Sequence, residues 1–432
     1  MSDTPEAHYG CSRDYHLFGP GPKRILSLDG GGVRGAISVA FLERIEKILD
    51  ERAGLEVRLG DWFDLIGGTS TGAIIAAALA LGKRVDYVKK IYFQLAPRVF
   101  RSSWRVPKLQ AKFATGPLRK EIDNIVGDIK LGDEELITGL AIIAKRIDTG
   151  SPWILANNPA SDFWENRTGS RTIANKDYRL ATLLRASTAA PTYFDPEIIA
   201  ITKDAPVDPL GPIAASGLLP SWIQLSATKI RAIFGYLLPR FGPSENTHGL
   251  FIDGGVTPYN NPANLLLMLA TLKQFGICWK YGPQELTIVS IGTGSFRPKL
   301  TFGDLANPLM RQLNLIERTI LSCITDGQNL TLAQMQWLGE CPVRWPVNSE
   351  IHGVEDNPPP GGPWFRFMRY DVGLDQTWML DKLGRKVDAA EAAGLQQMDS
   401  TEFIEKLYEI GARAANMQVE PRHLFGDDRA VN

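Results

Sequence analysis

The stretch GTSTG, in which Ser70 stands between Gly68 and Gly72, carries residue types that acyl-transfer chemistry requires. It follows an apolar segment and precedes a run of small and apolar residues that predicts a helix. A serine in this setting is typical of a nucleophile elbow, where the glycines permit a sharp turn and keep bulk away from the hydroxyl. The N-terminus of the helix would favour an alkoxide or oxyanion. The stretch therefore predicts a serine nucleophile.

A second glycine-rich stretch, DGGGVRG at residues 29–35, also follows an apolar segment and opens a helical pattern. It satisfies the GxGxxG dinucleotide fingerprint, but a strand, a glycine turn and a helix N-terminus favour any anion. In a dinucleotide fold the next strand should end in an acidic residue that binds a ribose hydroxyl. Here that strand ends in GGTSTG, and Asp29 would crowd a pyrophosphate.

The favoured interpretation of DGGGVRG is a loop that stabilises a transient oxyanion. A serine nucleophile needs backbone N–H donors, commonly from the residue after it and from a neighbouring loop. These donors would come from Thr71 and from the loop glycines, which are Gly30, Gly31 and Gly32. Arg34 either holds a substrate phosphate or pairs with a carboxylate, because arginine suits both.

Asp253 is the candidate base for Ser70. It closes the apolar segment GLFID and is followed by two glycines, so its carboxylate should emerge at the same sheet edge as the serine. The alternative is a turn-forming Asp-Gly pair. None of the five histidines lies in a recognisable strand-end motif. An aspartate is a weak base at neutral pH unless its surroundings are dry and a hydrogen bond orients it.

The elements that must position these residues alternate between strands and helices. This pattern predicts an α/β fold with a mostly parallel central sheet sandwiched by helices. We expect an α/β catalytic core over residues 20–300, and over residues 301–432 a mainly helical portion packed on that core. The predicted strands span residues 24–28, 62–67, 136–143, 153–157, 249–253 and 286–292, and the helical faces comprise Leu313, Ile316, Ile320 and Ile324, then Phe403, Leu407, Ile410 and Ala414 after a capping pair of Asp399 and Glu402.

Composition narrows the classes of protein. The 432 residues include 47 basic and 48 acidic ones, so no net field would hold a nucleic acid polymer. The four cysteines form no CxxC pair, which predicts reduced structural thiols rather than a zinc site or a disulfide framework. The longest apolar run, residues 73–81, is about half of a membrane span. The N-terminal residues have no signal core, and we expect a cytoplasmic protein.

DGGGVRG, GTSTG and DGG, in that order, resemble the three signature blocks of patatin-like phospholipases, which are lipid acyl hydrolases with a Ser-Asp dyad. The segments ASTAAPTYF (186–194), QMQWLGE and MRYDVGLD resemble the family and its bacterial members, so the likeness covers about residues 20–420. The resemblance implies Ser70 as nucleophile, Asp253 as base, and the three loop glycines with Arg34 as anion-binding loop. It implies hydrolysis of membrane glycerolipid esters through an acyl-enzyme, with no metal or cofactor.

One segment departs from the family pattern. About fifty residues, 200–248, intervene between APTYF and the aspartate strand, and they are strongly apolar. They form either a packed helical insertion or a lid that docks on a membrane through residues 216–241, where basic side chains (Lys229, Arg231, Arg240) lie among or beside apolar ones at helical spacing (Trp222, Ile223, Ile230, Phe234, Leu237).

Three functional classes remain open on the sequence. The leading one is a phospholipase A-type lipid hydrolase that is peripheral to the membrane when active. Some bacterial patatin-like enzymes are defence effectors switched on by a cyclic nucleotide, which would need a nucleotide pocket that the sequence does not identify. The second class is a dinucleotide-binding oxidoreductase that uses GxGxxG. The third is a catalytically silent binding module, which the presence of both Ser70 and Asp253 disfavours.

Overall fold

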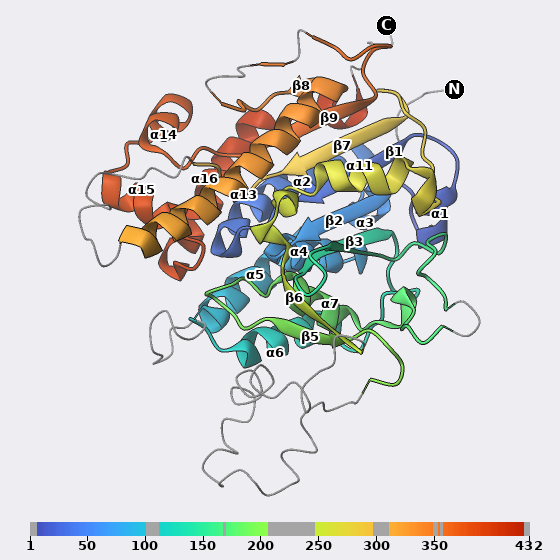
Figure 1. Ribbon diagram of the computed structural model, residues 1–432. Coiled ribbons are helices and arrows are strands. Elements are labelled where there is room, and N and C mark those ends of the chain that lie inside the picture. Colours follow the sequence, from blue (N-terminus) through green and yellow to red (C-terminus); the bar gives the residue numbers. More distant parts are fainter. Residues whose placement is uncertain are drawn as a thin grey trace, which may run out of the picture.

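The computed structural model describes residues 7–100, 112–166, 170–205, 247–296, 311–348, 353–354 and 357–426 (Figure 1). Within these ranges nine strands form one mixed sheet in the order β5-β6-β3-β2-β1-β7-β9-β8, with β4 paired to β3 outside this path. The strands are β1 (Lys23–Leu28), β2 (Leu65–Thr69), β3 (Gly139–Arg146), β4 (Pro152–Ala156), β5 (Glu197–Ala200), β6 (His248–Asp253), β7 (Leu286–Ile291), β8 (Gly339–Val343) and β9 (Phe365–Tyr370).

Helices cover both faces of the sheet. One buried apolar cluster joins it to α2, α4, α5, α6, α7 and α16, and a second joins it to α11 and α13, which cross the face towards the viewer in Figure 1. The α-helices are α1 (Arg13–Phe18), α2 (Gly35–Ala53), α3 (Leu59–Trp62), α4 (Thr71–Ala80), α5 (Val85–Val99), α6 (Thr115–Val126), α7 (Leu180–Ser187), α11 (Ala263–Thr271), α13 (Arg311–Leu338), α14 (Gln376–Leu383), α15 (Ala389–Gln396), α16 (Ile404–Gln418) and α17 (Pro421–Phe425).

The predicted α/β fold is confirmed, including the parallel centre of the sheet. β2 pairs with β1 and β3 in parallel, and β1 with β7, whereas β3 pairs with β4 and β6 in the antiparallel sense. Each predicted strand corresponds to an observed one. The second begins at Leu65 instead of residue 62, because Leu59–Trp62 winds into the short helix α3.

The C-terminal portion is mainly helical, as expected, but it also contributes two strands that the sequence analysis did not predict. β8 and β9 extend the sheet beyond β7. Leu407, Ile410 and Ala414 are buried on one face of α16, as predicted. The predicted capping pair is wrong, because Asp399 forms an ion pair with Lys112 and the turn before α16 begins after Ser400.

The sheet brings the ends of three strands together at one place. Thr69, the last residue of β2, pairs with Ile143 of β3, and Asp253, the last residue of β6, pairs with the next β3 residue, Ala144. On the other side of β2, the last residue of β1 pairs with Gly68. The residues that follow β1, β2 and β6 therefore lie at one edge of the sheet.

Several predictions fall outside the described residues. Residues 216–241 lie there, with all the apolar and basic side chains predicted for membrane docking, and only the ends of the 200–248 segment are described. The backbone of α13 is described from residue 311, but the side chains of Leu313, Ile316 and Ile320 are not. None of the helices in the described ranges combines the length and hydropathy that crossing a bilayer requires.

All four cysteines are free. Cys278 and Cys323 are exposed, so these two are not structural core residues.

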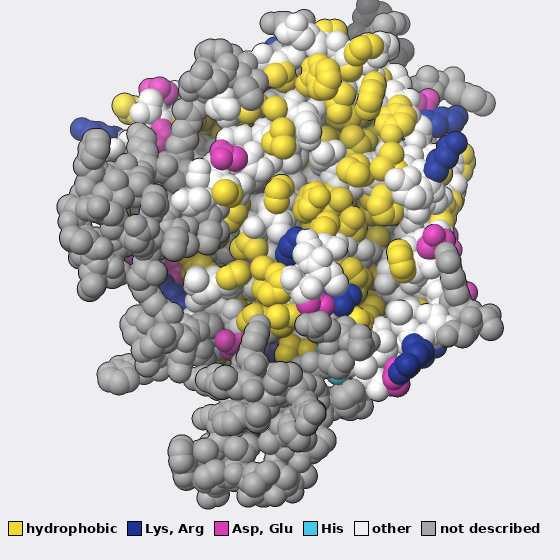
Figure 2. All heavy atoms as spheres, in the orientation of Figure 1, with side chains coloured by type: hydrophobic (Ala, Val, Ile, Leu, Met, Phe, Trp, Pro, Cys, Tyr) yellow, Lys and Arg dark blue, Asp and Glu magenta, His cyan; other side chains and the backbone are white. Residues whose placement is uncertain are grey.

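Large hydrophobic side chains lie exposed on the face that carries α11 and α13. Figure 2 shows them gathered over α11 and the C-terminal part of α13, where Met268, Leu330 and Trp337 are 40%, 59% and 44% exposed. This face adjoins the residues that follow β6, because a side chain at Gly327 of α13 would lie 2.6 Å from the Cα of Pro258. Contiguous apolar surface of this kind marks an interaction site on a protein surface.

Candidate active site

Ser70 occupies a strained turn between β2 and α4. Its backbone angles are φ 56° and ψ −127°, and such a positive φ is rare for any residue other than glycine. Such strain persists only where the surroundings enforce it, and it concentrates at functional sites. The flanking glycines are required by close contacts: a Cβ on Gly68 would lie 2.3 Å from the carbonyl carbon of Gly72, and one on Gly72 would lie 2.6 Å from the Leu28 oxygen.

The Ser70 hydroxyl donates a hydrogen bond to the carboxylate of Asp253, with 2.6 Å between Oγ and Oδ2. The other carboxylate oxygen accepts the N–H of Gly255 at 2.6 Å, which fixes the orientation of the carboxylate. Asp253 is only 3% exposed. Burial raises the pKa of Asp253 to about 6, against the hydrogen bonds from Ser70 and Gly255 and the charge of Arg185. The carboxylate is therefore ionised at neutral pH and more basic than an exposed aspartate.

The glycine loop after β1 lies against Ser70. A Cβ on Gly30 would be 3.0 Å from the Ser70 Cβ and 2.7 Å from Asn260 Oδ1, so only glycine allows this approach. The Gly30 N–H donates to the Asn260 carbonyl at 3.3 Å. Within the described part of the chain, the N–H groups of Gly31, Gly32 and Thr71 make no hydrogen bond to another residue. These three are the candidate oxyanion donors, whereas Gly30 contributes close approach rather than a free donor.

Neighbouring segments hold this loop in place. The Gly30 carbonyl accepts from Thr293 Oγ1 at 3.0 Å and from Asn260 Nδ2 at 3.4 Å. The Tyr92 hydroxyl of α5 donates to the Gly32 carbonyl, and the Val33 N–H donates to the Met398 carbonyl. Because hydrogen bonds from neighbouring segments fix the carbonyl groups of the loop, its N–H groups keep a fixed direction.

A buried ion-pair network anchors the residue that precedes the loop. Arg369 of β9 contacts both carboxylate oxygens of Asp29, at 3.0 and 2.7 Å, and it also contacts Asp371 at 2.8 Å. Asp371 in turn accepts the N–H of Gly294 at 2.9 Å. Burial by itself lowers the pKa of Arg369, but Asp29 and Asp371 more than compensate and raise it. The sequence analysis missed this network, although Arg369 and Asp371 lie in the MRYDVGLD segment.

Arg34 is buried behind the loop. It is 5% exposed, it donates to the Gly294 carbonyl at 3.3 Å, and its guanidinium carbon lies 5.1 Å from the centre of the Phe296 ring. Burial lowers the pKa of Arg34 to about 10. Among the described residues it makes no ion pair, so the carboxylate pairing considered from the sequence is not seen. A contact with a substrate phosphate stays a prediction.

Ser187 is a further residue of the site that sequence reasoning missed. Its hydroxyl accepts the Ser70 N–H at 2.9 Å and donates to the Ile143 carbonyl at 2.6 Å. It thereby ties the elbow to β3 and occupies the Ser70 amide. The signal was present, because Ser187 lies in the ASTAAPTYF segment, but the segment alone assigns it no partner.

The described histidines lie in other surroundings. His248 begins β6, five residues before Asp253 and thus about 17 Å along the strand. His423 contacts the Tyr370 hydroxyl, and His8 and His16 lie next to the buried Asp64. His352 is outside the described residues. In the described part of the chain, no group of three or more His, Cys, Asp or Glu side chains is arranged to hold a metal ion.

A strained serine between a strand and a helix, with a glycine loop beside it, is the nucleophile elbow of serine hydrolases of α/β fold, and here a carboxylate contacts the hydroxyl where a histidine commonly does. A comparison with known families agrees with this class. The model of the family described as "Patatin-like phospholipase" matches residues 26–267. The chain belongs to this family. The matched family is one of phospholipases and not of dinucleotide-binding oxidoreductases.

Curated relatives are similar to this chain over part of its length. A "cGAMP-activated phospholipase" of Escherichia coli (strain TW11681) is 33% identical over 40% of this chain and 48% of its own length. A "cUMP-AMP-activated phospholipase" of Escherichia coli is 32% identical over 41% and 50%. "Patatin-like protein 1" of Arabidopsis thaliana is 28% identical over 63% and 58%. The chain thus spans about half the length of the curated relatives that it matches.

Proposed function

We propose that this protein is a serine lipid acyl hydrolase of the phospholipase A type, which cleaves fatty-acyl esters of membrane glycerophospholipids. The observation that carries the proposal is the 2.6 Å hydrogen bond from the strained Ser70 to the buried Asp253. Membership of the patatin-like phospholipase family supports the substrate class. We also propose that residues 20–300 form the catalytic core and that residues 301–432 complete it through β9.

The reaction begins when Ser70 Oγ attacks the ester carbonyl carbon while its proton passes to Asp253 Oδ2. The carbonyl oxygen becomes an oxyanion that the N–H groups of Gly31, Gly32 and Thr71 stabilise. The intermediate collapses, the alcohol leaves with the proton from Asp253, and the acyl group stays on Ser70. Asp253 then takes a proton from water, which attacks the acyl-enzyme, and it returns that proton to Ser70 as the fatty acid leaves.

Two features of Asp253 suit it to this role. Burial makes the carboxylate a stronger base than usual, and it still carries a charge at neutral pH because its pKa is about 6. The Gly255 N–H occupies Oδ1 and so leaves Oδ2 directed at the serine. A single carboxylate can then move each proton in both half-reactions, and no histidine is needed between it and the serine.

A lipid substrate calls for contact with a membrane surface. We propose a transient contact, and residues 216–241 remain the segment predicted from the sequence for it. The exposed side chains of Met268, Leu330 and Trp337 offer further apolar surface on the face next to the residues that follow β6. Peripheral binding from the cytoplasm is the form of association that we expect.

Activation by a cyclic nucleotide is a second candidate, within the same activity. It rests on the relatives named as cGAMP-activated and cUMP-AMP-activated phospholipases. Under this proposal the protein is an antiphage defence effector that stays weakly active until the nucleotide binds. Adding cyclic dinucleotides to the enzyme with phospholipid vesicles should then raise the rate of fatty-acid release. An unchanged rate with each nucleotide would contradict activation and would indicate a constitutive hydrolase.

Labelling with a fluorophosphonate probe tests the proposed chemistry. The probe should add to Ser70 in the wild-type protein, as located by mass spectrometry, because only an activated serine reacts rapidly with it. Ser70→Ala should abolish both labelling and fatty-acid release, while the matched variant Ser161→Ala should keep both. Labelling at another serine, or release by a folded Ser70→Ala protein, would refute the assignment. Titration with NAD tests the oxidoreductase alternative. That alternative, and not the proposed hydrolase, predicts binding of NAD with micromolar affinity.

A further inference from the structure

The last glycine of DGGGVRG, Gly35, has no part in the proposed chemistry, but it makes room for a buried tyrosine. A Cβ on Gly35 would lie 2.4 Å from the Tyr92 hydroxyl oxygen and 2.9 Å from the ring carbon that bears it. The backbone of Gly35 has φ −59°, which any residue can adopt. Glycine is therefore required here by the close approach of Tyr92 and not by the backbone conformation.

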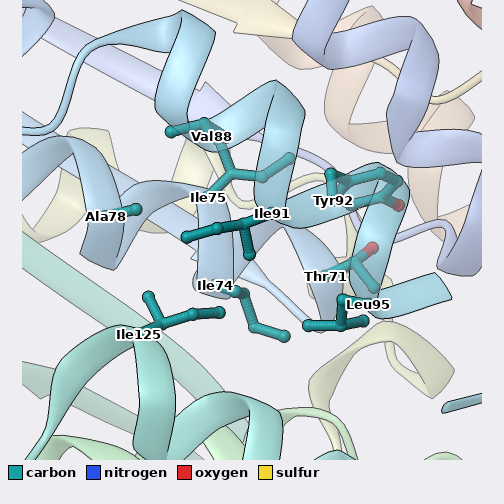
Figure 3. A pocket seen from close by; sticks show the side chains of 9 residues that line it. All are labelled: Thr71, Ile74, Ile75, Ala78, Val88, Ile91, Tyr92, Leu95 and Ile125. Carbon is teal, nitrogen blue, oxygen red and sulfur yellow. The ribbon is translucent and has the colours of Figure 1, made fainter. Parts of the chain in front are cut away.

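Tyr92 reaches the glycine loop from α5 and is only 5% exposed. Its hydroxyl donates to the Gly32 carbonyl, which also accepts the Gly35 N–H. Burial raises the pKa of Tyr92, and the nearby Thr71 hydroxyl only partly opposes this, so the phenol stays protonated at neutral pH and can donate. Figure 3 shows the oxygen atoms of Tyr92 and Thr71 at the same end of a small cavity that both residues line.

The peptide group between Gly32 and Val33 is held at both of its polar atoms. Tyr92 contacts its carbonyl, and its N–H donates to the Met398 carbonyl at 2.7 Å. Gly32 has φ 57°, and three successive glycines give this stretch more backbone freedom than other residues would. The direction of the Gly32 N–H, a candidate oxyanion donor, thus depends on contacts from outside the loop.

We propose that Tyr92 is a positioning residue for the oxyanion donors, and that position 35 is glycine so that the Tyr92 hydroxyl can reach the loop. The inference rests on the proposed function. Tyr92 acts through the loop in this role and does not touch the substrate. It fixes the Gly32 carbonyl and stands beside Thr71, so it connects the loop donors with the donor that follows Ser70. The two sets of N–H groups then keep the spacing that a single oxyanion requires.

Steady-state hydrolysis of p-nitrophenyl butyrate tests this role. Tyr92→Phe removes only the hydroxyl, and Gly35→Ala displaces it. We expect each variant to lower kcat by about tenfold and to leave KM nearly unchanged, because the donors act in the transition state. The double variant should be about as slow as either single variant, because both changes remove the same hydrogen bond.

Two matched variants separate positioning from a general loss of packing. Tyr178→Phe removes another buried hydroxyl that donates to a carbonyl, that of Ala200 at 3.2 Å. Gly116→Ala adds a Cβ to a helical glycine that has open space around it. Both variants should keep the wild-type kcat.

An unchanged kcat in a folded Tyr92→Phe or Gly35→Ala protein overturns the proposal, and so do multiplicative losses in the double variant. If one of the two single variants does not fold, as judged by its thermal melt, the other decides. If the wild-type protein hydrolyses neither this ester nor a phospholipid, the proposed function fails, and hydrogen exchange then tests the positioning alone. Deuterium uptake by peptides that cover residues 29–35 should be faster in Tyr92→Phe than in the wild-type protein and unchanged in Tyr178→Phe. Equal uptake in all three proteins overturns the role of Tyr92.

Discussion

Replacing Asp253 by asparagine should stabilise the protein at neutral pH while it removes activity. The buried carboxylate has a pKa of about 6, against an ordinary value of 3.8, because burial disfavours its charged form. At about 1.4 kcal/mol per pKa unit, this difference corresponds to about 3 kcal/mol of folding free energy. Asparagine keeps the shape and can still accept the Gly255 N–H, but it carries no charge into the interior.

The sign of this effect depends on pH. The pKa of Asp253 is higher in the folded than in the unfolded state, so its contribution to stability is greatest below pH 3.8 and is lost as the pH rises through 6. Asp253→Asn should therefore match the wild-type protein near pH 4. Above pH 7 it should be more stable by up to about 3 kcal/mol.

Urea unfolding at pH 4.5 and pH 8, followed by tryptophan fluorescence, measures this difference. Asp371→Asn is the matched control, because Asp371 is equally buried but pairs with Arg369 at 2.8 Å. Removing one partner of a buried ion pair should destabilise by about 3–5 kcal/mol. If Asp253→Asn destabilises the protein equally at both pH values, Asp253 does not hold a costly charge. If it retains most of the turnover, Asp253 is not the base.

Three further predictions follow from the same site. First, kcat/KM should rise with pH through about 6, because Asp253 must be ionised to accept the serine proton; a limb near pH 4 would contradict its burial. Second, Gly31→Ala should lower kcat by about a hundredfold or more and change KM less, because it displaces an oxyanion donor: the new Cβ would lie 2.3 Å from Thr293 Oγ1. A fall confined to KM would argue against that role. Third, His248→Ala and His423→Ala should each keep most of the turnover, and an inactive but folded histidine variant would mean a triad.

The sequence predicted those residues of the candidate site that come directly after a strand. GTSTG and DGGGVRG each come directly after an apolar run, and the C-terminal ends of parallel neighbouring strands lie at one edge of the sheet. This rule places the two glycine stretches side by side, although it cannot say which N–H groups stay free. The carbonyl of Asn260 decides that for Gly30. β6 runs antiparallel to β3, so Asp253 comes near Ser70 through the register that pairs it with Ala144, which no strand-end rule predicts.

The residues that support the site were out of reach of the same reasoning. Arg369 meets Asp29 across 340 positions of the chain, on a strand inside a portion with mainly helical periodicity. No local pattern identifies which carboxylate a buried arginine will contact. Ser187 belongs to a helix, and its two hydrogen bonds depend on how α7 packs on β2 and β3. Both are tertiary contacts between segments whose own patterns specify only burial.

The contacts of the two buried aspartates beside the site, Asp29 and Asp253, explain why only Asp253 can serve as the base. Burial raises the pKa of both carboxyl groups to about 6, so the pKa does not distinguish them. Their contacts do, because both oxygens of Asp29 contact the guanidinium of Arg369, which fixes the residue before the glycine loop. Asp253 accepts its hydrogen bonds from neutral donors, and its Oδ2 faces the Ser70 hydroxyl, where it can accept the proton. Exchanging the contacts of Asp29 and Asp253 would therefore abolish both the positioning of the loop and the proton transfer, even if every residue of the three glycine stretches stayed in place.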